Sequence, residues 1–193
     1  MQKHAQKGFT LIELLVVIAI IAILSVVVIL TLNPAELIRQ ARDSNRISDL
    51  NTIKSAISLF LADTASSTIG DYTKCYVDTI TTNSTTTCGG TGTSGTTVGS
   101  SATPRAVDST GWIPIRFTAI SSGAPFGSLP IDPLDNDKSH FYAYHNSSST
   151  ASTFKLTVQM ESIKYKAGGP NDIVGTDGGY SATVYEVGTD LNL

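Results

Sequence analysis

Glu13 is the residue of this chain whose position most needs a chemical explanation. It is a lone carboxylate near the start of an otherwise apolar run, between Phe9 and Leu32. A charged side chain inside a membrane helix costs up to ~3 kcal/mol at the bilayer centre and less toward an end. Glu13 therefore either reaches out to the membrane interface or accepts a positive partner within an assembly. Its own chain offers only Lys7 nearby, unless cleavage of the chain creates a new amine.

The two cysteines, Cys75 and Cys88, are the other pair with evident chemistry, and both follow the apolar run. If that run places the rest of the chain outside the cytoplasm, the cysteines lie where disulfides persist. A bridge would close a loop of about a dozen residues and stabilise the fold by roughly 3 kcal/mol. The alternative is two free thiols.

No catalytic or nucleotide-binding motif is present in the sequence. His140 and His145 are five residues apart on one expected strand, hence on opposite faces, which does not suit joint metal binding. The acidic turn at 135–139 lacks the Gly and the terminal Glu of an EF-hand loop. We therefore expect a protein that is not an enzyme.

Bulk composition excludes nucleic acid as an expected partner. The 193 residues carry 13 Lys and Arg against 16 Asp and Glu, with a net charge of −3. The basic residues are scattered, so they form no footprint for a phosphate backbone. The length suits a small domain with a core plus an anchor.

The anchor is the segment Leu14–Leu32, which contains no charge and only Ser25 and Thr31 as polar residues. Nineteen helical residues span roughly 28 Å, which matches the hydrocarbon core of a bilayer. The segment is longer than the apolar region of a signal peptide, and no small-residue cleavage site follows it, so we expect it to be retained. Lys3 and Lys7 place the amino-terminal flank in the cytoplasm, although arginines on the other flank weaken that argument.

The segment from Lys7 to Val17, KGFTLIELLVV, resembles the prepilin processing motif of type IV pilins and type II secretion pseudopilins. The resemblance implies that a prepilin peptidase removes residues 1–8 as a leader by cutting between Gly8 and Phe9, and methylates the new Phe9 amine. It also implies that Glu13 docks subunits by pairing with the Phe9 amine of a neighbouring subunit. Such a pair fixes register between subunits.

A long helix from about Phe9 to Ala62, kinked at Pro34, is the simplest architecture. Its first half is apolar all round, and its second half is amphipathic. Arg46, Asp49, Asn51, Lys54 and Ser58 are expected on the polar side, whereas one face carries the apolar positions Ile47, Leu50, Ile53, Ile57, Phe60 and Leu61. We expect a sheet to pack on that apolar stripe, because the polar set is too irregular for a coiled coil.

The remainder, 34–193, is expected to be a globular domain of the α+β class with a small antiparallel sheet of three or four strands. A Ser/Thr/Gly-rich stretch at about 65–111 is predicted to be an exposed loop between helix and sheet. Alternating or aromatic-rich runs predict the strands, with Pro114 restricting the first to an edge: 112–117, 140–145, 154–160 and 180–187.

A second resemblance involves Leu129-Pro-Ile-Asp132-Pro133 and Phe141-Tyr-Ala-Tyr144. These are similar to the Pro-x-Asp-Pro and Tyr-x-Tyr region of secretion major pseudopilins, but Leu134-Asp135 stands where that family usually has Trp-Gly. The choice between pilus and secretion subunit therefore stays open. The same resemblance raises calcium near the carboxyl-terminal strands, with Asp172 and Asp177 as weak candidate ligands; their spacing matches no calcium loop, and Asp-Gly is also a turn signal.

These observations predict the structural subunit of a type IV pilus-like filament, with a major-type pseudopilin as the alternative. The precursor would cross the cytoplasmic membrane once, and its 9–33 helix would then form the core of an extracytoplasmic homo-oligomeric helical filament. Its expected partners are the prepilin peptidase, the pilus or secretion assembly machinery, and the membrane. A different class, a single-pass anchored binding module that never polymerises, has no use for Glu13.

Overall fold

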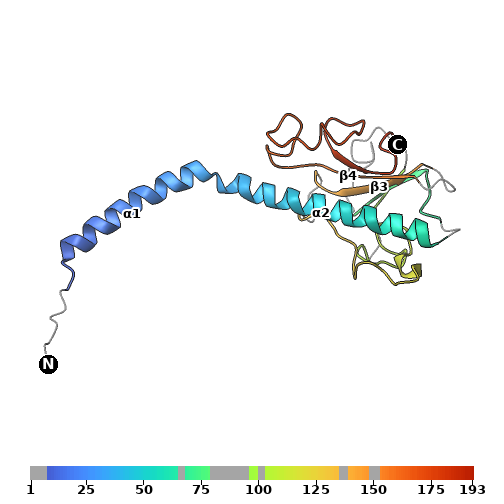
Figure 1. Ribbon diagram of the computed structural model, residues 1–193, viewed down its shortest axis with the longest axis horizontal. Coiled ribbons are helices and arrows are strands. Elements are labelled where there is room, and N and C mark those ends of the chain that lie inside the picture. Colours follow the sequence, from blue (N-terminus) through green and yellow to red (C-terminus); the bar gives the residue numbers. More distant parts are fainter. Residues whose placement is uncertain (1–7, 65–67, 79–95, 100–102, 135–138, 148–152) are drawn as a thin grey trace, which may run out of the picture. The chain divides into compact units, whose positions relative to one another are not determined.

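The computed structural model describes residues 8–64, 68–78, 96–99, 103–134, 139–147 and 153–193 (Figure 1). The chain divides into two compact units, one ending at Ile38 and the other running from Arg39 to Leu193. Each unit is described by itself.

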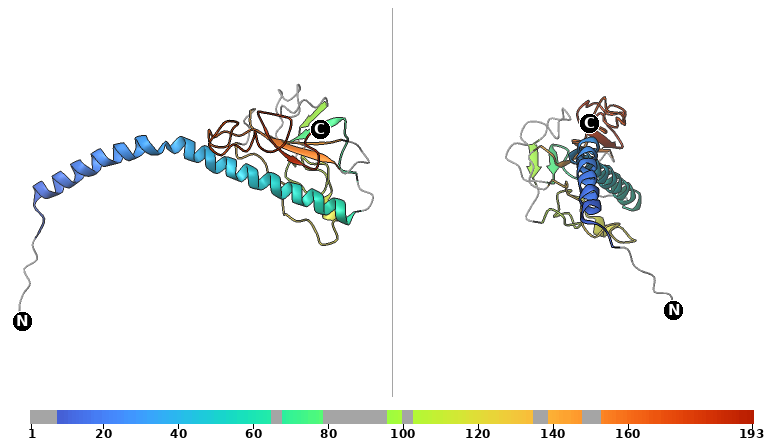
Figure 2. Two further views of the ribbon diagram at one scale, coloured as in Figure 1. Left: turned by 45° about the horizontal axis from the view of Figure 1, so that its top comes forward. Right: turned by 90° about the vertical axis from the view of Figure 1, so that its left-hand side faces the viewer.

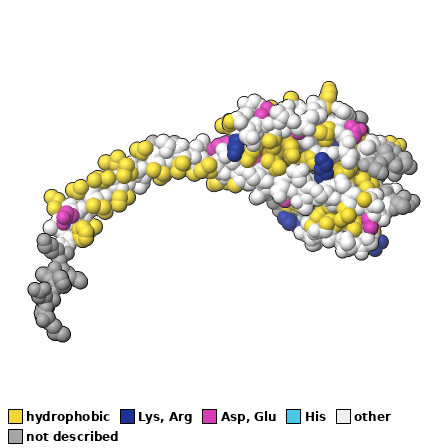
Figure 3. Space-filling model, viewed as in Figure 1, with side chains coloured by type: hydrophobic (Ala, Val, Ile, Leu, Met, Phe, Trp, Pro, Cys, Tyr) yellow, Lys and Arg dark blue, Asp and Glu magenta, His cyan; other side chains and the backbone are white. Residues whose placement is uncertain are grey.

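The first unit is built on helix α1, Leu11–Leu32. Its apolar side chains are exposed, and those on the face seen in Figure 3 are drawn in yellow. The segment Leu11–Ile29 is long and apolar enough to cross a membrane. The two hydroxyls of the helix are turned inward, because Ser25 donates to the carbonyl of Ile21 (2.7 Å) and Thr31 to that of Val27 (3.0 Å). Neither hydroxyl therefore needs water as a partner.

Asn33 separates α1 from helix α2, Pro34–Asp63. It caps α1 with a left-handed backbone (φ 40°, ψ 71°), and its carbonyl accepts the N–H groups of Glu36 (3.0 Å) and Leu37 (3.3 Å). Pro34 occupies the first helical position, where its missing N–H costs nothing. The predicted kink at Pro34 is thus a break, and the residue that makes it is Asn33.

The second unit packs α2 against a five-stranded sheet in the order β2-β1-β3-β4-β5, visible beside the helix in Figures 1 and 2. Its strands are β1 (Lys74–Val77), β2 (Thr96–Gly99), β3 (Tyr142–Asn146), β4 (Phe154–Val158) and β5 (Tyr185–Gly188). Strands β1, β3, β4 and β5 are antiparallel neighbours, whereas β2 runs parallel to β1 at one edge. The α+β prediction, with a helix on a four-stranded antiparallel sheet, is confirmed.

The core lies between the apolar stripe of α2 and one face of the sheet, as the stripe predicted. Leu50, Ile53 and Ile57 are fully buried there and belong to the same cluster as Leu156 on β4. Five strand residues in a row are buried on both β3 and β4, so both faces of the central strands are covered. The simple alternation expected for a sheet with one wet face therefore fails here.

Two predictions about local structure are wrong. The segment 112–117 is not a strand: Trp112, Ile113, Ile115 and Phe117 are all buried, and the short 3-10 helix η2 (Phe117–Ala119) follows. These residues belong to a long connection, 103–134, that packs on α2 on a different side from β3 and β4 (Figures 1 and 2). Strands β1 and β2 instead lie inside the stretch 65–111 that was expected to be a loop.

Candidate functional site

The amino-terminal end of α1 is closed by a capping box that involves Glu13. Thr10 is the N-cap residue, and its hydroxyl accepts the backbone N–H of Glu13 at 3.3 Å. In return, Oε2 of Glu13 accepts the backbone N–H of Thr10 at 2.8 Å and its hydroxyl at 2.7 Å. The Thr-x-x-Glu spacing is the sequence signal for this motif. Thr10 and Glu13 have this spacing, so the sequence alone carries a signal for the capping box.

Both Thr10 donors converge on a single carboxylate oxygen. Oε1 of Glu13 accepts no hydrogen bond from the described part of the chain. The capping box thus holds the carboxylate at the first turn of α1, where the positive end of the helix dipole favours a negative charge. One oxygen stays available for a further donor.

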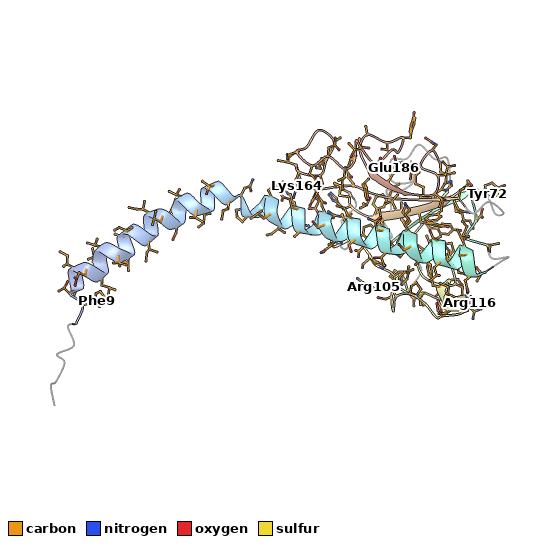
Figure 4. The ribbon with its side chains drawn as sticks, in the orientation of Figure 1. Phe9, Tyr72, Arg105, Arg116, Lys164 and Glu186 are labelled. Atoms are coloured by element: carbon orange, nitrogen blue, oxygen red, sulfur yellow. The ribbon has the colours of Figure 1, made fainter. Side chains whose placement is uncertain are left out.

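The Gly8–Phe9 peptide lies outside the helix and is accessible. Gly8, Phe9 and Thr10 precede α1, and the Phe9 side chain is 90% exposed and projects from the chain just before the helix (Figure 4). A Cβ placed on Gly8 would meet no atom within 4 Å. The bond predicted to be cut is therefore neither in a helix nor covered by the described residues.

A second polar cluster lies where α2 meets the sheet, and the prediction for its central residue is wrong. Arg46, expected on the solvent side of α2, is completely buried. Its Nε and Nη2 donate to Oδ2 and Oδ1 of Asp132 at 2.7 and 2.8 Å. Its Nη1 donates to Asp43 at 2.8 Å and also to Glu161. We refer to Arg46, Asp43, Asp132 and Glu161 as the Arg46 cluster.

The Arg46 cluster places three carboxylates around one guanidinium, and donors from outside the cluster also bind these carboxylates. Arg42 adds a second guanidinium to Glu161, through Nε at 2.8 Å and through Nη2. Burial would raise the pKa of the Glu161 carboxyl, but the hydrogen bonds from Arg42 and Arg46 outweigh it and lower that pKa to about 2. Oδ1 of Asp43 accepts the backbone N–H of Glu161 (3.0 Å), and Oδ2 accepts that of Ser162 (2.7 Å).

The Arg46 cluster continues into the sheet through Asp78, which follows β1. Its carboxylate accepts the backbone N–H of Asp132 (2.7 Å) and that of Tyr142 at the start of β3 (3.0 Å). The Tyr142 hydroxyl then donates to Asp49 on α2 at 2.8 Å. The Asp of the Pro-x-Asp-Pro segment and the first Tyr of Tyr-x-Tyr are therefore joined in one polar circuit that returns to α2.

Only one cysteine of the predicted disulfide lies in the part of the chain that the structure describes. Cys75 is fully buried in β1, whereas Cys88 lies outside the described residues. The pairing of Cys75 with Cys88 stays a prediction.

The calcium candidates are engaged with backbone donors. The Asp172 carboxylate accepts the N–H groups of Gly168 (2.7 Å) and Gly175 (2.6 Å), and that of Asp177 accepts the N–H of Gly179 (2.8 Å). Within the described residues, no group of three or more His, Cys, Asp or Glu side chains is arranged to hold a metal ion. Calcium binding by Asp172 and Asp177 remains a sequence expectation.

Comparison with known proteins bears on the amino-terminal segment. Residues 3–29 match the family model for the prokaryotic N-terminal methylation motif. No curated protein and no solved structure matched the chain. The resemblance of the segment to prepilins is therefore confirmed at the level of this motif.

The motif and the apolar helix together point to a class of protein. They support a type IV pilin-like or pseudopilin protein made as a membrane-anchored precursor. Proteins of this class are structural rather than catalytic, and the motif implies processing by a prepilin peptidase and pilus assembly.

Proposed function

We propose that this chain is a structural subunit of a type IV pilus-like filament that polymerises through α1 after cleavage between Gly8 and Phe9. The leader would be residues 1–8, the filament-core helix residues 9–33, and the outward-facing domain residues 34–193. The free Oε1 of Glu13 carries the proposal. The capping box needs only Oε2 of Glu13, so it explains the carboxylate in a plain anchor but leaves Oε1 for a donor from another subunit.

The new amine at Phe9 is the natural partner for that oxygen. Cleavage places a positive charge four residues before Glu13, too close along the chain for easy pairing within one helix. A neighbouring subunit shifted along the filament axis brings its own Phe9 amine to Oε1, while Thr10 keeps Oε2. Pairing neutralises the carboxylate inside an apolar bundle, where an unpaired charge would be costly.

The first experiment is the intact mass and amino-terminal sequence of the protein from its native membrane or surface fraction. We expect a chain that begins at Phe9 and carries one added methyl group. A chain that still begins at Met1, in cells with an active prepilin peptidase, would refute the processing step and leave a single-pass anchored module.

Polymerisation is tested separately by Glu13→Gln, which keeps the shape of the side chain and removes its charge. The variant should be cleaved normally and accumulate in the membrane without forming filaments. Thr52→Val, an exposed change on α2, is the control and should leave filaments unchanged. Filaments of normal abundance from Glu13→Gln would remove the charge pair from the proposal.

The second candidate is a major-type pseudopilin of a type II secretion system. It is favoured by the Pro-x-Asp-Pro segment, whose Asp132 lies in the Arg46 cluster. Deleting the gene distinguishes the two roles: loss of surface filaments with normal secretion supports the pilus, and loss of secretion supports the pseudopilus.

A further inference from the structure

The exposed side of α2 carries no charge over most of its length. The structure describes every residue of this helix, and the exposed ones between 41 and 62 are all Ala, Ser, Asn, Thr or Leu. An exposed helix side normally carries charged residues, which keep it in water. The charged residues of this stretch are all buried or half-buried instead: Arg42, Asp43, Arg46, Asp49 and Lys54.

Four exposed residues mark one line along this side of α2. Ser44, Ser48, Ser55 and Leu59 follow one another at intervals of four and seven residues, which keeps them on the same side of a helix. We refer to these four residues as the uncharged face.

Hydroxyl groups of the uncharged face are bonded within the helix itself. The Ser44 hydroxyl donates to the carbonyl of Gln40 at 2.9 Å, and the Ser55 hydroxyl donates to that of Asn51 at 2.8 Å. A partner that covered the face would therefore leave neither of these donors without an acceptor. The face can lie in water before assembly and accept an apolar partner afterwards.

A groove lies beside the uncharged face. It has a volume of about 440 Å³, and its lining includes Ser48, Ser55 and Leu59 of the helix and Pro125 of the connection 103–134. Leu59 is 42% exposed and offers apolar contact there. The groove is open to the surface, so side chains of an apposed helix can enter it.

The same chain presents an apolar helix that needs a cover. Every described side chain of α1 is exposed, and its large apolar side chains are 47–81% exposed. Lipid covers such side chains in the membrane, but in a filament outside the membrane other copies of the chain must do so. A charged surface would lose the hydration of its charges against α1, whereas the uncharged face would not.

We propose that α1 of a second copy covers the uncharged face of α2 in the filament. This inference rests on the proposed function and adds which side of the outer domain turns toward the filament core. The covering copy is displaced along the filament axis, as the pairing of Glu13 with the Phe9 amine of a neighbour already requires. The small side chains of the serines let the apposed backbone approach closely.

The first test adds charge to the uncharged face. S48D/S55D and S48N/S55N have side chains of the same shape and differ only in two negative charges. Both positions are exposed, so the two variants should unfold at similar urea concentrations in detergent. Surface filaments should be about tenfold or more less abundant for S48D/S55D than for S48N/S55N, because a carboxylate against an apolar helix is costly.

Thr183→Asp is the control for added charge at an exposed position elsewhere, just before β5. It should assemble like the wild-type chain. Equal filament abundance from S48D/S55D and S48N/S55N would overturn the inference.

The second test identifies the segment that covers the face. The photoreactive amino acid p-benzoylphenylalanine replaces Ser55 in a small fraction of subunits, which copolymerise with isotopically heavy wild-type chains. We expect cross-links to residues 9–32 of the heavy copy, and none to that segment when the same probe replaces Thr183. Cross-links from position 55 that reach only residues 39–193, or no cross-link between copies, would overturn the inference.

The two proposals fail in different ways. Wild-type chains that form no filaments would refute the proposed function, and this inference with it. Wild-type filaments together with either contrary result would refute the inference alone.

Discussion

The Arg46 guanidinium and the Asp132 carboxylate form a fully buried two-pronged ion pair, with Nε–Oδ2 and Nη2–Oδ1 distances of 2.7 and 2.8 Å. The residues are 86 positions apart in the chain. The pair therefore joins α2 to the connection 103–134, at the point where the Pro-x-Asp-Pro segment contacts the helix. Because the pair is buried, loss of either partner would leave a charge without a counter-ion and lower the stability of the domain.

Asp132→Ala should be strongly destabilising. The substitution leaves a buried guanidinium short of one carboxylate and removes the acceptor for the Leu134 N–H. We expect a loss of about 3–5 kcal/mol in the free energy of unfolding, measured by urea denaturation in detergent. Lys166→Gln, an exposed change, should shift it by less than about 0.5 kcal/mol. Similar stabilities for the two variants would mean that the buried pair contributes little.

Acid should weaken the fold through Glu161. The pKa of Glu161 in the folded chain is about 2, against an ordinary value of 4.5. A depressed folded pKa means that its contribution to stability is complete above pH 4.5 and is lost as the pH falls from about 4.5 to about 2. We expect the difference in unfolding free energy between wild type and Glu161→Gln to shrink across this interval. A difference that stays constant between pH 6 and pH 2 would contradict the assignment.

Thr10→Val should loosen the start of α1. The valine side chain has the shape of threonine but cannot accept from the Glu13 N–H or donate to the Glu13 carboxylate, which keeps only the backbone N–H of residue 10 as a donor. Loss of a threonine N-cap costs ~0.5–2 kcal/mol, so amide hydrogen exchange at Glu13 and Leu14, whose N–H groups bond to Thr10, should quicken about 2- to 30-fold in micelles. Thr10→Ser keeps the hydroxyl and should exchange like wild type. If valine and serine behave alike, the capping box does not hold this turn.

Reduction should lower the melting temperature if Cys75 and Cys88 are bridged. Opening a loop of about a dozen residues removes roughly 3 kcal/mol in the chain-entropy model. The check is alkylation of the unfolded chain without reductant, followed by mass measurement. Two alkylated cysteines would show free thiols and refute the bridge.

The helix and its buried stripe were predictable because both rest on local periodicity. Leu50, Ile53 and Ile57 mark the core face of α2 by their spacing alone. The burial of Arg46 was not predictable in this way, because an arginine between polar neighbours has the pattern of a solvated face. Its partners Asp132 and Glu161 are more than eighty residues away, and nothing local in the sequence pairs them with it.

The strands show the same difference between what local sequence predicts and what distant contacts decide. Phe154–Val158 was recognised from its alternating pattern, whereas Lys74–Val77 lies in a polar stretch that carries little strand signal and is ordered by its pairing with Tyr144 and Ala143. Conversely, the aromatic-rich segment 112–117 has strand composition, yet it buries consecutive side chains against α2 and forms no ladder.

By itself, the sequence determined the apolar helix that is long enough to cross a membrane, the methylation motif and the apolar stripe, since each depends on residues within a few turns of one another. Only the tertiary structure decided that Glu13 uses one carboxylate oxygen for Thr10 and that Arg46 is a buried partner of Asp132. Those outcomes depend on side-chain geometry and on contacts between distant segments. The free energy of a buried charge is set by the groups that surround it, and residue type and spacing along the chain do not reveal them.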